Sequence, residues 1–355
     1  MSADIVNNDV GTSLKQVEVA VTKLNPLRQT KSGKSSFTDA EVSYQSDDRS
    51  FHSFKLRIWS ADKLPSGVKA GFVIEIGELT IGEYQGNKQY TCNGDDVQIP
   101  VQDLNVYMQM VPGSYWSRDY LSQGLQEYVD KIGNDEYREL VKRCYQLVGK
   151  KLKQRGLSLL KMPAAVGMHH SFVGGLATHT LSMLKAADGY LTNTIYKETF
   201  DSDLVYAGIL LHDLAKSLCY TNELDHVETV AGSFFDHIVL VDGLICQVGE
   251  DVYQEPYLDL TTSDIEFMKL RHVVLSHHGK KEWGAPVQPE LPEAWLVHQI
   301  DVTDAHMEVI REQQADPQLD DQGFTNKVYA LDNARLYLVN NSGLKSEACN
   351  SACQK

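Results

Sequence analysis

The segment GILLHDLAKSL, residues 208–218, places a histidine and an aspartate side by side in an otherwise apolar sequence. Its leucines and isoleucine have the spacing of a core helix, so we expect His212 and Asp213 to be buried. Burying such polar groups is costly unless they are paired or bind a metal. Adjacent helical residues point about 100° apart, so both side chains can reach one ion. Lys216, one turn later, suits a phosphate oxygen, or it extends along the helix to solvent.

Histidine is concentrated in one part of the sequence. The chain has 355 residues and 12 histidines, of which 11 lie between positions 169 and 306. An even distribution would place only about five there. Because histidine is the commonest metal ligand and a frequent acid–base group, this window is where we expect the chemistry.

Further apolar segments in the window carry ligand-type side chains: His179 in GGLATHTLSML, His237 in FFDHIVL, His277 and His278 in VLSHHGK, and Asp301 in VHQIDVTDAH. For any one of these histidines alone, a hydrogen-bonded core histidine is the favoured explanation. Together, on helices that converge, they predict a metal site in a bundle core. Asp304 is an alternative ligand to Asp301. Mixed His/Asp ligation suits Mn²⁺, Fe²⁺, Co²⁺, Ni²⁺ or Zn²⁺, and the ligands suffice for two ions bridged by a carboxylate, as in phosphate-ester hydrolysis.

The sequence divides into an N-terminal region with strand patterns and a longer region with helical patterns, which carries the candidate ligands. Residues 1–15 are polar and expected to be disordered, and short alternating segments over 16–102 predict a small β-barrel, of which the OB-fold is one kind. We expect a connector over 103–118, a helical domain over 119–340 and a disordered tail over 341–355. The predicted fold class is therefore α+β, with an N-terminal OB-like barrel followed by an all-α bundle.

One predicted strand, residues 51–59, has two different faces. Alternation places apolar side chains on one face and the set Lys55, Arg57 and Trp59 on the other. Cations next to an aromatic ring are typical of single-strand binders, in which stacking contributes roughly 1–3 kcal/mol per base. From this strand alone, an exposed sheet face with one tryptophan covering a barrel end is the favoured explanation.

Composition restricts the function further. The formal net charge of −15 argues against a general nucleic-acid coat protein, but it is compatible with a locally basic channel and with divalent cations. A basic run over 150–161 leads toward the histidine window and is either a solvated helix face or a phosphate-facing one.

Six scattered cysteines without a CxxC motif favour a reducing, cytoplasmic setting. No apolar run approaches the roughly 18 residues of a membrane helix, so we expect no membrane partner.

The order His179, His212–Asp213, Asp301 resembles the signature of the HD-domain metal-dependent phosphohydrolases. The likeness extends to four segments of the helical region, HHSFVGGLATHT, YAGILLHDLAK, RHVVLSHHGKKEW and KVYALDNARLY. It also includes RIW and YQGNKQY in the barrel region. In this order they resemble the 3′→5′ exoribonucleases of the YhaM type, over about residues 16–337.

The resemblance implies an HD domain that removes nucleotides from the 3′ end of single-stranded RNA or DNA with Mn²⁺ or a similar ion. The implied first-metal ligands are His179, His212, Asp213 and Asp301. Asp213 would bridge to a second ion held by His237 with His277 or His278, and Lys216 would assist at the phosphate. The implied substrate contacts are His170 and Lys280 near the site and Lys55, Arg57, Trp59 and Tyr84 on the barrel.

Other functions share parts of this pattern. An HD phosphohydrolase acting on nucleotides would use the β domain for assembly or regulation. A binding module with an inert histidine-rich core would need no metal, and a di-iron oxygenase would need redox-active iron. HD proteins and OB domains both often assemble, so we also expect a homo-oligomer.

Overall fold

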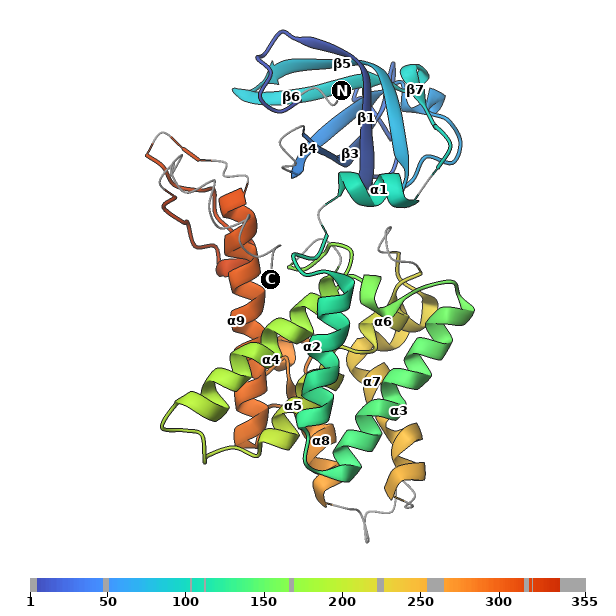
Figure 1. Cartoon of the computed structure of the whole chain (residues 1–355). Helices are drawn as coiled ribbons and strands as arrows, with labels where there is room; N and C mark the ends of the chain where they lie inside the picture. Colours follow the sequence, from blue (N-terminus) through green and yellow to red (C-terminus); the bar gives the residue numbers. More distant parts are fainter. Residues whose placement is uncertain are drawn as a thin grey trace. The chain divides into compact units, whose positions relative to one another are not determined.

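Alternating apolar residues build a closed five-stranded barrel in the N-terminal part of the chain (Figure 1). Its strands are β1 (Ser13–Leu24), β3 (Ser36–Gln45), β4 (Phe51–Trp59), β5 (Val73–Tyr84) and β6 (Asn87–Asn93). They pair in the order β1-β3-β4-β6-β5, and β5 pairs back with β1 to close the barrel. The β4–β6 pair is parallel and the other four pairs are antiparallel. This is the OB-like barrel predicted from the sequence.

The structure is a computed structural model that describes residues 5–46, 51–102, 104–111, 113–165, 169–221, 227–253, 265–315, 319–320 and 322–338. The chain divides into two compact units, Met1–Asp301 and Val302–Lys355. The first unit contains the barrel, its short strands β2 (Arg28–Gln29) and β7 (Val97–Gln98), and most of the helices.

The helical region begins with α2 (Arg118–Lys131) and α3 (Asp135–Gln154), capped by the side chains of Ser117 and Asn134. The remaining helices are α4 (Gly175–Asn193), α5 (Ser202–His212), α6 (Lys216–Cys219), α7 (Val230–Tyr253), α8 (Ile265–Ser276) and α9 (Pro292–Ala315). Their apolar faces share one core, so the predicted helical bundle is confirmed.

The boundaries differ from the prediction at both ends of the barrel. Residues 13–15, expected to be disordered, are the first residues of β1, and Ile5 is only 2% exposed because it packs into the barrel core. The expected connector contains α1 (Leu104–Met110), whose Tyr107 is buried against barrel residues Ala20 and Val73. An apolar helix face covering a barrel end explains why this segment is not a plain linker.

The second unit contains less helix than expected. After α9 the described residues form a short 3₁₀ turn, Tyr329–Leu331, and isolated bridges such as Phe324 with Tyr337. The prediction of helix to about residue 340 was therefore wrong beyond Ala315. The expected disordered tail, residues 341–355, lies outside the described residues.

Helix α7 corrects the expectation that no segment is long and apolar enough to cross a membrane. Its stretch Val230–Glu250 meets that test by length and composition, with a mean hydropathy of 1.3. One such helix is weak support for a span, because a core helix passes the same test. Here Ile238, Val241 and Ile245 are buried, and the latter two belong to the helical core.

Candidate metal centre

The His212–Asp213 pair lies where a helix ends, not in the middle of one as expected. Helix α5 stops at His212, and Asp213 is its C-cap with φ −109° and ψ 1°. A turn closed by Leu214 N donating to Leu211 O at 3.0 Å precedes α6, which begins at Lys216. The break leaves His212 and Asp213 both fully buried and directs both side chains to one point.

One oxygen of Asp213 faces a first group of ligands. Its Oδ2 lies 3.3 Å from His212 Nε2 and 3.7 Å from His179 Nε2 of α4. His179 Nε2 in turn lies 3.1 Å from Asp301 Oδ1 of α9. The ligand atoms of His179, His212 and Asp213 are close enough to hold one ion. The structure thus places Asp301, the predicted ligand, in contact with this group.

The other oxygen of Asp213 faces a second group. Its Oδ1 lies 3.3 Å from His237 Nε2 of α7 and 3.6 Å from His277 Nε2, directly after α8. His278 adds a third imidazole, and its ring centre lies 4.3 Å from that of His277. His237, His277 and His278 could together hold an ion. Asp213 therefore stands between two clusters, the position of a bridging carboxylate.

Backbone carbonyls fix the orientation of these imidazoles. His212 Nδ1 is 2.7 Å from Ile209 O, His277 Nδ1 is 2.7 Å from Val274 O, and His278 Nδ1 is 2.8 Å from Trp283 O. A carbonyl can only accept, so each Nδ1 donates its hydrogen. In a neutral imidazole, Nε2 then keeps a free lone pair, which is the tautomer that metal-binding histidines adopt.

Buried polar atoms without hydrogen bonds test whether a metal fits. Asp213 Oδ1, His237 Nε2 and His277 Nε2 are such atoms within the described part of the chain. Each unsatisfied buried polar atom costs about 1–3 kcal/mol, so three in one place need an explanation. All three converge on the second cluster, and a divalent cation with mixed His/Asp ligation would satisfy them.

The electrostatics of the site keep its carboxylates ionised and His278 neutral, whereas burial of His237 is outweighed by its interactions with Asp213 and Asp236, which raise its pKa. Burial raises the pKa of Asp213 and Asp301, but nearby histidines outweigh it and hold both pKa values below their ordinary range. Lys216 also lowers the pKa of Asp213, and its Nζ is 2.7 Å from Asp213 Oδ2. Burial lowers the pKa of His278 to about 3, so this imidazole is neutral at neutral pH. Ionised carboxylates and neutral imidazoles are the forms that bind metals.

Comparison with known proteins agrees with this geometry. Residues 176–306 match the HD domain family. A protein of Halalkalibacterium halodurans named 3′-5′ exoribonuclease YhaM is 30% identical over 272 residues, 76% of this chain and 78% of that protein. The chain belongs to the YhaM family. A Bacillus licheniformis protein of the same name is 27% identical over 345 residues, 95% of this chain and 98% of that protein. The YhaM likeness therefore includes the barrel as well as the HD domain.

Two of the substrate contacts expected for a YhaM-type enzyme lie close to ligand residues. His170 is buried with its ring centre 5.1 Å from that of His179. Lys280 follows His278 by two residues, and its Nζ lies 4.1 Å over the Trp283 ring. Their roles toward a substrate stay predictions.

The barrel residues predicted to touch the YhaM substrate lie on one face, but that face is less basic than the sequence suggests. Arg57 forms a bidentate ion pair with Asp39 on β3, at 2.8 and 3.2 Å. Lys55 lies opposite Glu41 in the strand register, although Glu41 forms its ion pair with Lys23. The Trp59 ring lies beside the Phe37 ring, with 5.6 Å between centres. Tyr84, 58% exposed, is close enough to Arg57 to raise its pKa, after the larger effect of Asp39.

Three residues beside the candidate metal centre were missed from the sequence. His169 has its ring centre 5.6 Å from that of His179. Asp236 accepts from His237 Nδ1 and has a positive φ of 57°, which interrupts α7. His298 Nδ1 donates to His277 O at 2.8 Å and so supports the HH segment. An acid directly before a ligand histidine, as in FFDH, is the signal that could have found Asp236.

Gly279 follows the two histidines of HHGK and is expected to be essential for their placement. It has φ +74°, and a Cβ there would lie 2.2–2.5 Å from ring atoms of His298. We expect Gly279→Ala to lower the free energy of unfolding by at least about 2 kcal/mol and to reduce metal binding. Urea unfolding monitored by circular dichroism measures the first effect.

Gly156→Ala is the matched control, because Gly156 has nearly the same φ, +73°, and a Cβ added there would meet nothing within 4 Å. It should show only the backbone cost of about 1–2 kcal/mol. Equal losses in the two variants would show that the His298 ring moves aside and would contradict the expectation.

Proposed function

We propose that this protein is a metal-dependent 3′-5′ exoribonuclease that hydrolyses phosphodiester bonds of single-stranded RNA at its HD site. The observation that carries the proposal is Asp213, whose two oxygens face two different histidine clusters. Two relatives that bear this activity in their names and align with 76% and 95% of this chain support it.

The first ion would be held by His179, His212, Asp213 and Asp301, and a second by Asp213 with His237, His277 and His278. A divalent ion so bound would lower the pKa of a water molecule and neutralise charge on the phosphate. We propose Mn²⁺ as the ion, with Fe²⁺, Co²⁺, Ni²⁺ and Zn²⁺ as compatible alternatives for this donor set.

The remaining groups of the site act on the substrate. Lys216 is 13% exposed at its side chain and ion-paired with Asp213, and the carboxylates of Asp213 and Asp301 outweigh desolvation and raise its pKa. It therefore stays charged and can donate to a phosphate oxygen. His170 lines the His179 side of the site and would contact the terminal nucleotide. We also propose that the protein is cytoplasmic, that it forms a homo-oligomer, and that it accepts single-stranded DNA as a substrate.

The direction of degradation tests the function. RNA labelled at its 5′ end should be shortened in single-nucleotide steps with Mn²⁺, whereas RNA labelled at its 3′ end should release the label as mononucleotide at once. EDTA should stop both. Internal cuts, or hydrolysis of free nucleotides with no shortening of RNA, would contradict the proposal, and the latter result would favour a nucleotide phosphohydrolase.

A further inference from the structure

Positive charge is strongly segregated in this acidic chain. Residues 140–187 contain eight lysines and arginines and no aspartate or glutamate. The chain's formal charge is −15, so removing these +8 leaves −23 on the other residues. The basic residues fall mainly at the end of α3 and just after it, namely Lys150, Lys151, Lys153, Arg155 and Lys161. An accumulation of one sign in a chain of the opposite sign marks a surface for a ligand of complementary charge.

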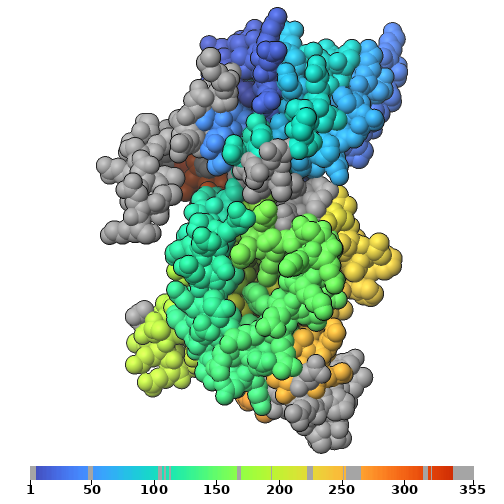
Figure 2. Space-filling model, turned by 45° about the vertical axis from the view of Figure 1, so that its right-hand side comes forward, coloured from blue at the N-terminus to red at the C-terminus, as the bar shows by residue number. Residues whose placement is uncertain are grey.

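Three of these lysines are available for such a ligand. Lys150, Lys151 and Lys153 are exposed, and none forms an ion pair with a carboxylate of the described residues. Figure 2 shows the end of α3 and the residues that follow it, in green, on the surface of the molecule. The barrel face is different, because Arg57 there is paired with Asp39.

The basic segment leads directly to the metal centre. Arg155 donates to Tyr220 O and Thr221 O, at 2.5 and 2.8 Å, just beyond the helix that begins with Lys216. Lys161 O accepts from Gly174 N at 3.0 Å, next to the start of α4, which carries His179. Ala164 N donates to His170 O at 3.1 Å. Hydrogen bonds therefore hold the basic segment, residues 150–161, next to the end of α6 and next to the start of α4, the two helices that carry Lys216 and His179.

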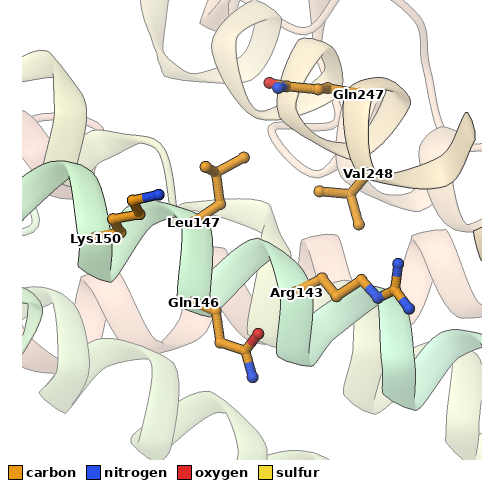
Figure 3. A pocket seen from close by; sticks show the side chains of 6 residues that line it. All are labelled: Arg143, Gln146, Leu147, Lys150, Gln247 and Val248. Carbon is orange, nitrogen blue, oxygen red and sulfur yellow. The ribbon is translucent and has the colours of Figure 1, made fainter. Parts of the chain in front are cut away.

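A groove lies further along α3, away from the site. Its volume is about 330 Å³, and Figure 3 shows its lining: Arg143, Gln146, Leu147 and Lys150 of α3 with Gln247 and Val248 of α7. Gln247 is ten residues after His237 on α7, which corresponds to about 15 Å along a helix. Leu147 offers apolar surface to a base, the two amides offer hydrogen bonds, and Lys150 suits a phosphate. Arg143 is ion-paired with Glu139 at 2.6 Å, and Val248 is almost fully buried.

We propose that the single strand whose 3′ end is degraded lies with its phosphates along Lys150, Lys151 and Lys153, and that the Arg143–Lys150 groove receives a nucleotide upstream of the scissile bond. This inference rests on the proposed function. It assigns most of the electrostatic binding of RNA to the helical domain and not to the barrel, where Arg57 is paired with Asp39.

The test measures RNA affinity in the absence of cleavage. A 5′-fluorescein oligoadenylate is titrated with Asp213→Asn protein at several salt concentrations between about 50 and 200 mM. Adding Lys150→Gln, Lys151→Gln and Lys153→Gln should weaken binding about tenfold and reduce the salt slope by about 2, since each single-strand phosphate contact contributes about 0.7. Glutamine keeps a long polar side chain without the charge, and circular dichroism checks the fold.

The matched control removes three lysines of the same domain that already have carboxylate partners: Lys131, Lys197 and Lys269. It changes the net charge equally and should alter the salt slope far less. Equal slopes for the two triple variants, or a slope of the α3 variant equal to that of its parent, would overturn the inference. This experiment measures binding without cleavage, so neither result bears on the proposed exoribonuclease activity. That activity is tested separately by the end-label assay.

Discussion

Asp213→Asn is expected to abolish RNA degradation while leaving the fold intact. Asparagine keeps the shape of the side chain but cannot supply two anionic oxygens, one to each histidine cluster. The activity should fall at least about 10³-fold, equivalent to roughly 4 kcal/mol of transition-state stabilisation. A 5′-labelled RNA assay under single-turnover conditions measures the loss.

Metal-dependent stabilisation distinguishes a lost site from a misfolded protein. In EDTA the variant should melt at a lower temperature than the unchanged protein, because the nearly buried Lys216 ammonium loses the carboxylate with which it is paired. With Mn²⁺ only the unchanged protein should gain stability, by about 2.7 kcal/mol at a hundredfold excess over the dissociation constant. An Asp213→Asn protein that retains activity would favour the inert histidine-rich core.

Substituting one histidine in each cluster should show whether the two clusters bind two different ions. His237→Ala removes a ligand of the second cluster, and His179→Ala removes one of the first. We expect each variant to bind one Mn²⁺ fewer than the unchanged protein and to lose about 10²–10³-fold in activity. Equilibrium dialysis with metal analysis gives the stoichiometry.

His272→Ala is the control, because His272 Nε2 accepts from Glu290 N and lies in neither cluster. It should keep the full metal content. Loss of all metal in both His179→Ala and His237→Ala would indicate one shared ion and contradict the bridging position of Asp213.

The sequence predicted the architecture well where short patterns determine it. Alternation in residues 51–59 gave the inner face of β4, with Phe54, Leu56 and Ile58 buried. Boundaries were less predictable, because Ile5 is buried only through contacts with distant strands, and α1 owes its place to the barrel end that it covers. Such tertiary contacts leave no periodic signal.

The ligand set was largely predictable from residue types, but its local geometry was not. His212 and Asp213 share a site because a helix ends between them, whereas the apolar spacing indicated one continuous helix. The ion pair of Arg57 with Asp39 depends on strand register, which the sequence of one strand does not reveal. His169 was missed because only the folded chain shows that its ring faces that of His179, whereas Asp236 did carry a sequence signal, since it directly precedes His237.

Anomalous X-ray diffraction from Mn²⁺-containing crystals tests the central claim most directly. The account predicts one peak among His179, His212, Asp213 and Asp301, and a second beside Asp213 Oδ1 among His237, His277 and His278. Mn²⁺ bound only at other carboxylates, with Asp213 contacting Lys216 and no ion, would contradict it.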